Sequence, residues 1–101
     1  MKDKNYDKLK ENLHNYTEDL VLETMKNVLS QEKFSDVCKC EQCLLDIASF
    51  TLNRVPAKYI VSHAGNIHAK LDEFKQQYNV DIISTITKAI KVVSKEPHHN
   101  N

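Results

Sequence analysis

The chain has 101 residues, and its 14 basic and 14 acidic side chains give a formal net charge of zero. This length predicts a single domain with a thin hydrophobic core, which a metal ion or a second chain would help to stabilise. A neutral chain lacks the strongly basic surface that binds DNA, and no apolar run approaches the roughly 20 residues that cross a bilayer, so we expect neither direct DNA binding nor a membrane-spanning segment.

The scarcity of helix-breaking residues predicts an all-α fold, a small helical domain of about four helices. The chain contains one glycine and two prolines. Apolar residues recur about every 3.6 positions between residues 5 and 30, which predicts a first helix there, either continuous or broken near its asparagines. Residues 30–40 are polar and carry thiols, so we expect a loop. We divide the chain into an N-terminal arm over residues 1–9, a helical domain over residues 10–95 and a disordered tail over residues 96–101.

The middle of the chain predicts a helix followed by an extended segment. Apolar positions at helical spacing indicate a second helix over residues 42–54. Pro56 ends this helix, because proline disfavours the helical conformation in the residue before it. Residues 58–62 are β-branched and aromatic, which favours an extended strand. The Ala-Gly-Asn sequence at residues 64–66 indicates a turn.

The C-terminal third predicts two further helices. Apolar residues at helical spacing indicate a third helix over residues 67–78, which Asn79 would interrupt. Asn79 or Asp81 would then cap a fourth helix, because both side chains accept hydrogen bonds from the first backbone N–H groups of a helix. The inner face of this fourth helix would carry Ile83, Ile86, Ile90 and Val93.

All three cysteines lie close together, as Cys38, Cys40 and Cys43 in the spacing C-x-C-x-x-C. The N-terminal residues lack the apolar segment of a signal peptide, so we expect a cytoplasmic protein, where clustered thiols bind metals or act as redox groups more often than they form disulfides. Structural zinc takes four nitrogen or sulfur ligands in a tetrahedron. The fourth ligand would be a histidine, a water or a residue of a second subunit. The histidine candidates are His14, His63, His68, His98 and His99, and the last two are the weakest because we expect the tail to be disordered.

Two other interpretations of the cysteines stay open. The C-x-x-C half could be a redox pair, although no βαβ pattern surrounds it. Buried cysteines can also serve as small hydrophobic residues, although the charged residues between these cysteines favour a loop.

A second candidate site follows the predicted second helix. No acidic residue occurs between Asp46 and Asp72, and this segment contains Arg54 and Lys58, which predicts a local positive patch. Arginine offers a planar group to a phosphate or a guanine, and an aromatic ring such as Tyr59 can stack on a base. The competing interpretation is that the cations are ordinary surface residues and Tyr59 belongs to the core. The candidate ligand-binding residues are Asn53, Arg54, Lys58, Tyr59 and Ser62.

The order of these features resembles the late competence development protein ComFB family. The shared pattern is the C-x-C-x-x-C cluster, an aspartate and an alanine in the next helix, and then Leu-Asn-Arg, a proline, a basic residue and a tyrosine. The family often has two prolines where this chain has Pro56 and Ala57. The likeness covers most of residues 10–95. The matching residues are Cys38, Cys40, Cys43, Asp46, Ala48, Leu52, Asn53, Arg54, Pro56, Lys58 and Tyr59.

The resemblance implies a homodimeric helical protein with cysteine-bound zinc. Some family members are receptors for cyclic di-GMP with roles in competence, pili or motility, acting on a protein partner that the sequence does not identify. The resemblance would place Arg54 on a guanine, Lys58 near a phosphate and Tyr59 in the wall of the site. The alternatives are a zinc-stabilised adaptor without a nucleotide and a thiol redox sensor. The sequence contains no glycine-rich phosphate loop and no nucleophile motif, so we expect no enzymatic activity.

Overall fold

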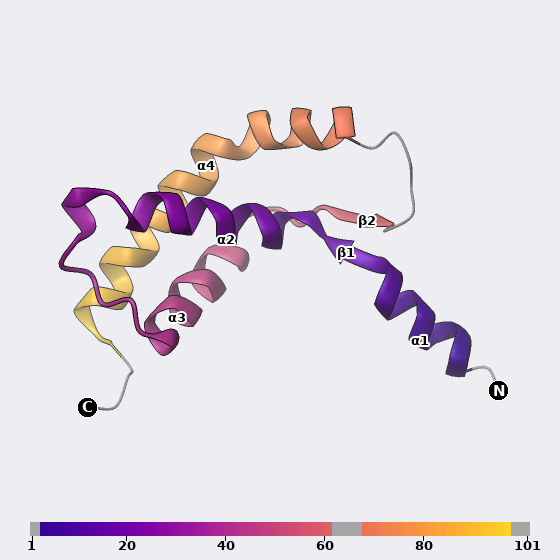
Figure 1. Cartoon of the computed structure of the whole chain (residues 1–101), viewed down its shortest axis with the longest axis horizontal. Helices are drawn as coiled ribbons and strands as arrows, with labels where there is room; N and C mark the ends of the chain where they lie inside the picture. Colours follow the sequence, from indigo (N-terminus) through magenta and orange to yellow (C-terminus); the bar gives the residue numbers. More distant parts are fainter. Residues whose placement is uncertain (1–2, 62–67, 98–101) are drawn as a thin grey trace.

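The computed structural model describes residues 3–61 and 68–97, which form four α-helices, one short 3₁₀ helix and a two-stranded sheet. The helices α2, α3 and α4 pack together, whereas α1 extends away from them (Figure 1). The predicted all-α fold of about four helices is therefore confirmed, although the boundaries of two helices differ. None of the helices in the described residues is both long and apolar enough to cross a bilayer. The elements are α1 (Asp3–Asn12), β1 (Leu13–Asn15), α2 (Tyr16–Leu29), η1 (Glu32–Phe34), α3 (Glu41–Leu52), β2 (Tyr59–Val61) and α4 (His68–Lys95).

The predicted first helix is interrupted at an asparagine, as one of the two alternatives allowed. Residues Leu13–Asn15 form β1 and separate α1 from α2. Asn15 has an extended backbone, and its side-chain oxygen accepts a hydrogen bond from the Thr17 N–H at 3.1 Å. This bond caps α2, because it satisfies an N–H group that has no partner within the helix.

The prediction of two helices in the C-terminal third is wrong, because α4 is continuous from His68 to Lys95. Asn79 and Asp81 are exposed within it, where each weakens a helix by less than about 1 kcal/mol relative to alanine. The packing of the helix on both sides of them outweighs that cost. Ile83 is 39% exposed and does not lie on the inner face as predicted. The buried residues of this face are Leu71, Ile82, Ile86, Ala89 and Ile90. The predicted turn at residues 64–66 lies outside the described residues.

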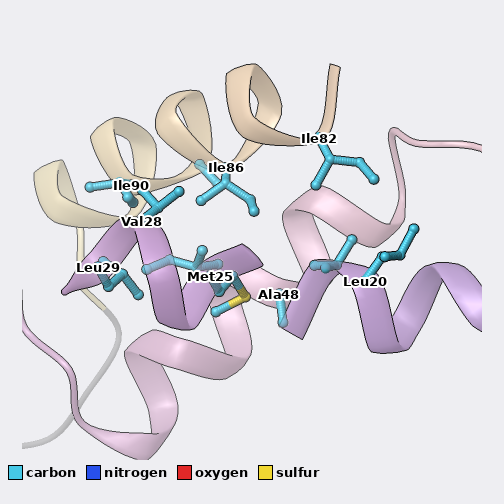
Figure 2. Packing of buried hydrophobic residues seen from close by; sticks show 11 residues of the cluster. Leu20, Met25, Val28, Leu29, Ala48, Ile82, Ile86 and Ile90 are labelled. Carbon is cyan, nitrogen blue, oxygen red and sulfur yellow. The ribbon is translucent and has the colours of Figure 1, made fainter. Parts of the chain in front are cut away.

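The hydrophobic core lies between α2, α3 and α4. Its largest fully buried apolar side chains are Val21 of α2, Ile47 of α3, and Ile82 and Ile86 of α4. Figure 2 shows the isoleucines of α4 facing the apolar residues of α2, with Ala48 of α3 nearby. The core thus fixes α3 from two sides, and both candidate sites lie at the ends of α3.

Residues 53–58, here called the elbow, join α3 to β2. The predicted extended segment is confirmed for Tyr59–Val61, which pair antiparallel with β1. The sequence did not predict β1, whose three residues gain their strand character from this pairing. The register places Leu13 opposite Val61 and Asn15 opposite Tyr59.

The start of α2 holds the elbow through three hydrogen bonds. The Asn15 side-chain oxygen that caps α2 also accepts from the Lys58 N–H at 3.0 Å. The Tyr16 N–H donates to the Lys58 carbonyl at 2.7 Å. The hydroxyl of Thr17, which is 1% exposed, donates to the Pro56 carbonyl at 2.7 Å. A segment of three residues therefore fixes the path of the chain on both sides of Ala57.

Replacing the Thr17 hydroxyl should destabilise the fold. Thr17→Val keeps the branched shape and removes the donor to the Pro56 carbonyl, so we expect the free energy of unfolding in urea to fall by about 1–3 kcal/mol. Thr85→Val is the matched control, because the Thr85 hydroxyl donates to the Asp81 carbonyl within the exposed surface of α4. The control should change stability by less than about 0.5 kcal/mol. Equal losses in both variants would contradict a special role for the Thr17 bond.

Candidate functional site

The three cysteines meet at the start of α3. Their Sγ atoms all lie within 4.8 Å of one another. In a tetrahedral zinc site with Zn–S bonds of about 2.3 Å, neighbouring sulfurs are about 3.8 Å apart. The cluster would therefore contract by at most about 1 Å to hold such an ion. The donor set and its spacing fit a metal ion that prefers thiolates.

Backbone geometry brings the sulfurs to the same side. Cys40 is the N-cap of α3, and its Sγ accepts from the Cys43 N–H at 3.4 Å. The preceding loop is closed by Lys39, whose Nζ donates to the carbonyls of Phe34 at 3.0 Å and Val37 at 3.1 Å. These bonds turn the Lys39 ammonium toward the loop backbone and place Cys38 beside the helix start. Sequence reasoning missed this role of Lys39.

Cys43 is 2% exposed and differs from the other two cysteines, which lie at the surface. Burial, followed by hydrogen bonds with Cys38 and Cys40, raises the pKa of the Cys43 thiol from its ordinary value of 9.0 to about 12. A metal must therefore displace a proton from Cys43, so its affinity should rise with pH.

The cluster contains three donors among the side chains that the structure describes, and no further histidine or carboxylate joins them there. His14, one of the candidates for a fourth ligand, instead pairs with Asp19 at the start of α2. His63, the side chain of His68, and the pair His98 and His99 lie outside the described residues.

The elbow begins at the other end of α3. Asn53 is the C-cap, and its Nδ2 donates to the Ser49 carbonyl at 2.8 Å. The guanidinium of Arg54 lies 3.5 Å from the centroid of the Phe50 ring, and its Nη1 donates to the Phe50 carbonyl at 2.9 Å. A guanidinium has five N–H donors, so this bond leaves others for a ligand. Sequence reasoning missed Phe50, although its position four residues before Arg54 in the helix predicted over residues 42–54 signals the contact.

The structure separates the remaining predicted ligand residues. Lys58 lies against α4, with its Nζ 5.8 Å from the centroid of the Phe74 ring, whereas Arg54 lies against α3. Tyr59 is 64% exposed, so the interpretation that it belongs to the core is wrong. Ser62 lies outside the described residues.

Comparisons with known proteins identify a matching family and a similar solved structure. A family model described as late competence development protein ComFB matches residues 14–97. Among solved structures, the chain is similar to the late competence protein ComFB from Bacillus subtilis, with 26% sequence identity and a TM-score of 0.58 over 84% of this chain and 91% of that chain. No curated protein matches the chain. The family match includes the cysteines and the elbow and begins within β1.

The cysteine cluster predicts a bound metal that depends on all three sulfurs. Protein purified without added metal should contain about one thiolate-binding ion per chain, and Cys40→Ser should lose it because three protein ligands become two. Elemental analysis measures the content, and Ser35→Ala, in the same loop, serves as the control that should retain the ion. Native protein that folds normally and contains no metal would contradict the prediction.

Proposed function

Because the chain belongs to the late competence development protein ComFB family, we propose that it is a non-enzymatic, zinc-containing signalling protein that binds cyclic di-GMP and acts on competence, pili or motility. The family match supports the biological setting. The nucleotide ligand comes from the resemblance to family members that bind it, and the elbow of this chain supplies the physical support developed below.

Zinc is the proposed ion. Cys38, Cys40 and Cys43 offer thiolates, which suit zinc and iron–sulfur clusters, and a single tetrahedral ion fits three sulfurs within 4.8 Å. A bound zinc would supply structural cross-linking, tying the loop after η1 to the first turn of α3. The thiolates would lie at the helix N-terminus, where its positive potential favours negative charge.

The observation that carries the nucleotide proposal is the arrangement of Arg54 on Phe50. Arg54 is exposed, with its guanidinium 3.5 Å from the ring centroid. Cyclic di-GMP presents two guanines and two phosphates. A guanine can stack on a guanidinium plane, and the N–H groups can reach a guanine edge or a phosphate oxygen. The Lys58 N–H bond to the Asn15 side chain and the Thr17 hydroxyl bond to the Pro56 carbonyl hold the elbow in place before any ligand arrives, which lowers the entropic cost of binding.

Calorimetry with cyclic di-GMP tests this proposal. Arg54→Ala should weaken binding by about 1–3 kcal/mol, the usual effect of losing an arginine contact to a guanine. Lys33→Ala is the matched control, since Lys33 is also an exposed cation near a phenylalanine ring, at 5.2 Å from the Phe34 centroid. The control should bind as the native protein does. Native protein that produces no binding heat at high ligand concentration would contradict the receptor proposal and favour the adaptor.

A second copy of this chain is the proposed partner for an exposed apolar row on α1 and the sheet. Leu9 is 53% exposed, and Leu13 and Val61 stand opposite each other across the sheet with about half of their surfaces exposed. Helix α1 extends away from the helical core of its own chain, which leaves this row open to another molecule (Figure 1). A symmetric dimer would bury the same row on both copies. The residues of the row are Tyr6, Leu9, Leu13, Tyr59 and Val61.

Molecular mass in solution tests the dimer. Native protein should have the mass of two chains by light scattering, and Leu9→Glu should shift it toward one chain because a buried unpaired carboxylate is costly. Lys8→Glu is the matched control on the same helix and should remain dimeric. A native protein with the mass of one chain at high concentration would contradict the proposal.

The adaptor is the second candidate function, and a groove between α2 and α3 favours it. The groove has a volume of about 660 Å³, and its walls are largely apolar. Leu22 and Leu45 are about half exposed there, and the charged residues Lys26, Lys39 and Glu41 also line the groove. These features suit the apolar face of an amphipathic helix from a partner protein. A nucleotide receptor would also use such a surface to pass on its signal.

A further inference from the structure

The C-terminal end of α4 borders two cavities that differ in what lines them. The smaller cavity has a volume of about 160 Å³ and belongs to the metal centre, because Cys38 and Cys43 line it together with Pro97. The larger cavity, here called the α3–α4 pocket, has a volume of about 270 Å³ and lies between one side of α3 and the end of α4. This second cavity leads from the body of the protein toward Arg54.

The α3–α4 pocket adjoins Arg54 through the Phe50 ring. Asp46, Phe50 and Asn53 line the pocket from α3 and its C-cap, and their helical spacing places them on one face of the helix. The Phe50 ring also carries the Arg54 guanidinium, which lies 3.5 Å from the ring centroid. A ligand that fills the pocket would therefore lie beside the guanidinium.

The walls of the α3–α4 pocket combine apolar surface with negative charge. Phe50, Val92 and Val93 supply the apolar surface, and Val92 is 47% exposed, so a ligand would cover surface that water now contacts. The carboxylates of Asp46 and Glu96 line the same pocket, and among the described residues no lysine or arginine does. These walls would repel a phosphate and favour a flat group that presents N–H donors.

The two carboxylates are placed differently. Asp46 is partly buried, and its Oδ1 accepts a hydrogen bond from the Gln42 side chain at 2.9 Å, which holds the carboxylate in place. Glu96 directly follows the last residue of α4 and is exposed. Because a carboxylate can accept two parallel hydrogen bonds from adjacent N–H donors, Glu96 is the better placed of the two to bind such a group.

Guanine matches this pocket better than adenine does. The Watson–Crick edge of guanine carries two adjacent donors, N1–H and the 2-amino group, whereas that of adenine places a ring acceptor beside its amino group, and a carboxylate repels an acceptor. The flat faces of a base can pack against the Phe50 ring. The volume of about 270 Å³ lies below the range of about 300–1,000 Å³ that encloses a drug-sized ligand, so the pocket suits one base. A metal ion would leave the apolar walls unused.

We propose that the α3–α4 pocket holds one guanine of the cyclic dinucleotide, and that the Glu96 carboxylate accepts hydrogen bonds from its N1–H and 2-amino group. This inference rests on the nucleotide part of the proposed function. Glu96 is then the residue that selects guanine. The Arg54 guanidinium stays available for a phosphate or for the second guanine. The ligand would thus contact α3 and the end of α4, two segments that are far apart in the sequence.

Calorimetry with two matched ligands tests the inference. Cyclic di-IMP differs from cyclic di-GMP only in lacking the 2-amino groups. Native protein should bind cyclic di-GMP at least about tenfold more tightly, since a hydrogen bond to a charged group contributes about that much. Glu96→Ala should weaken cyclic di-GMP binding and bring the two affinities to within about twofold, because the acceptor is gone. Glu73→Ala, which removes an exposed carboxylate of α4 outside the pocket, should keep the native preference.

The outcomes separate this inference from the receptor proposal. If native protein binds both ligands equally, or if Glu96→Ala keeps the native preference, the guanine pocket is wrong and the receptor proposal stands. A preference that disappears in Asp46→Asn, with the fold intact by circular dichroism, but persists in Glu96→Ala would overturn the role of Glu96. If native protein binds neither ligand, the receptor proposal is wrong and the guanine pocket is wrong with it.

Discussion

A single side-chain oxygen connects the two halves of this fold. The Oδ1 atom of Asn15 accepts from the N–H of Thr17, which starts α2, and from the N–H of Lys58, which lies far along the chain. Either N–H group, if buried without a partner, would destabilise the fold by about 1–3 kcal/mol. The Asn15 oxygen accepts a hydrogen bond from both. The direction of the elbow, and with it the position of Arg54 and Tyr59, depends on this contact. The Lys58 side chain lies against the Phe74 ring of α4. The hydrogen bond from the Lys58 N–H to Asn15 therefore also helps to position α4 in the core.

Helix α3 separates the two candidate sites by its own length. It has 12 residues and is therefore about 18 Å long. The cysteines gather at its N-terminus, where the helix potential favours thiolates, and the Arg54 cation lies at its C-terminus, where the potential favours positive charge. Because Ile47 in the middle of α3 is fully buried, the helix holds both ends at fixed positions. Metal and nucleotide would then act on one rigid element without sharing a side chain.

The features that were predicted from sequence are those that local interactions determine. The second helix, predicted over residues 42–54, is α3, and the cysteines come together because a C-x-x-C pair at a helix start needs only one turn of backbone. β1 was missed because its strand pairing joins residues that are distant in sequence. The prediction that Asn79 interrupts the helix was wrong, because the burial of core residues such as Ile82 outweighs the low helix propensity of one exposed asparagine. The contact between Phe50 and Arg54 is local and was within reach of sequence reasoning.

The nearness of Pro97 to the cysteines has a practical consequence for producing the protein. A polyhistidine affinity tag fused after residue 101 would be attached only four residues beyond Pro97. Its imidazoles would compete for any ion at the thiolates and would distort measured stoichiometry and spectra. A tag on the N-terminal side would be joined to α1, at the far end of the molecule from the cysteine loop (Figure 1). An affinity tag at the N-terminus is therefore the better choice when the metal content of the protein is to be measured.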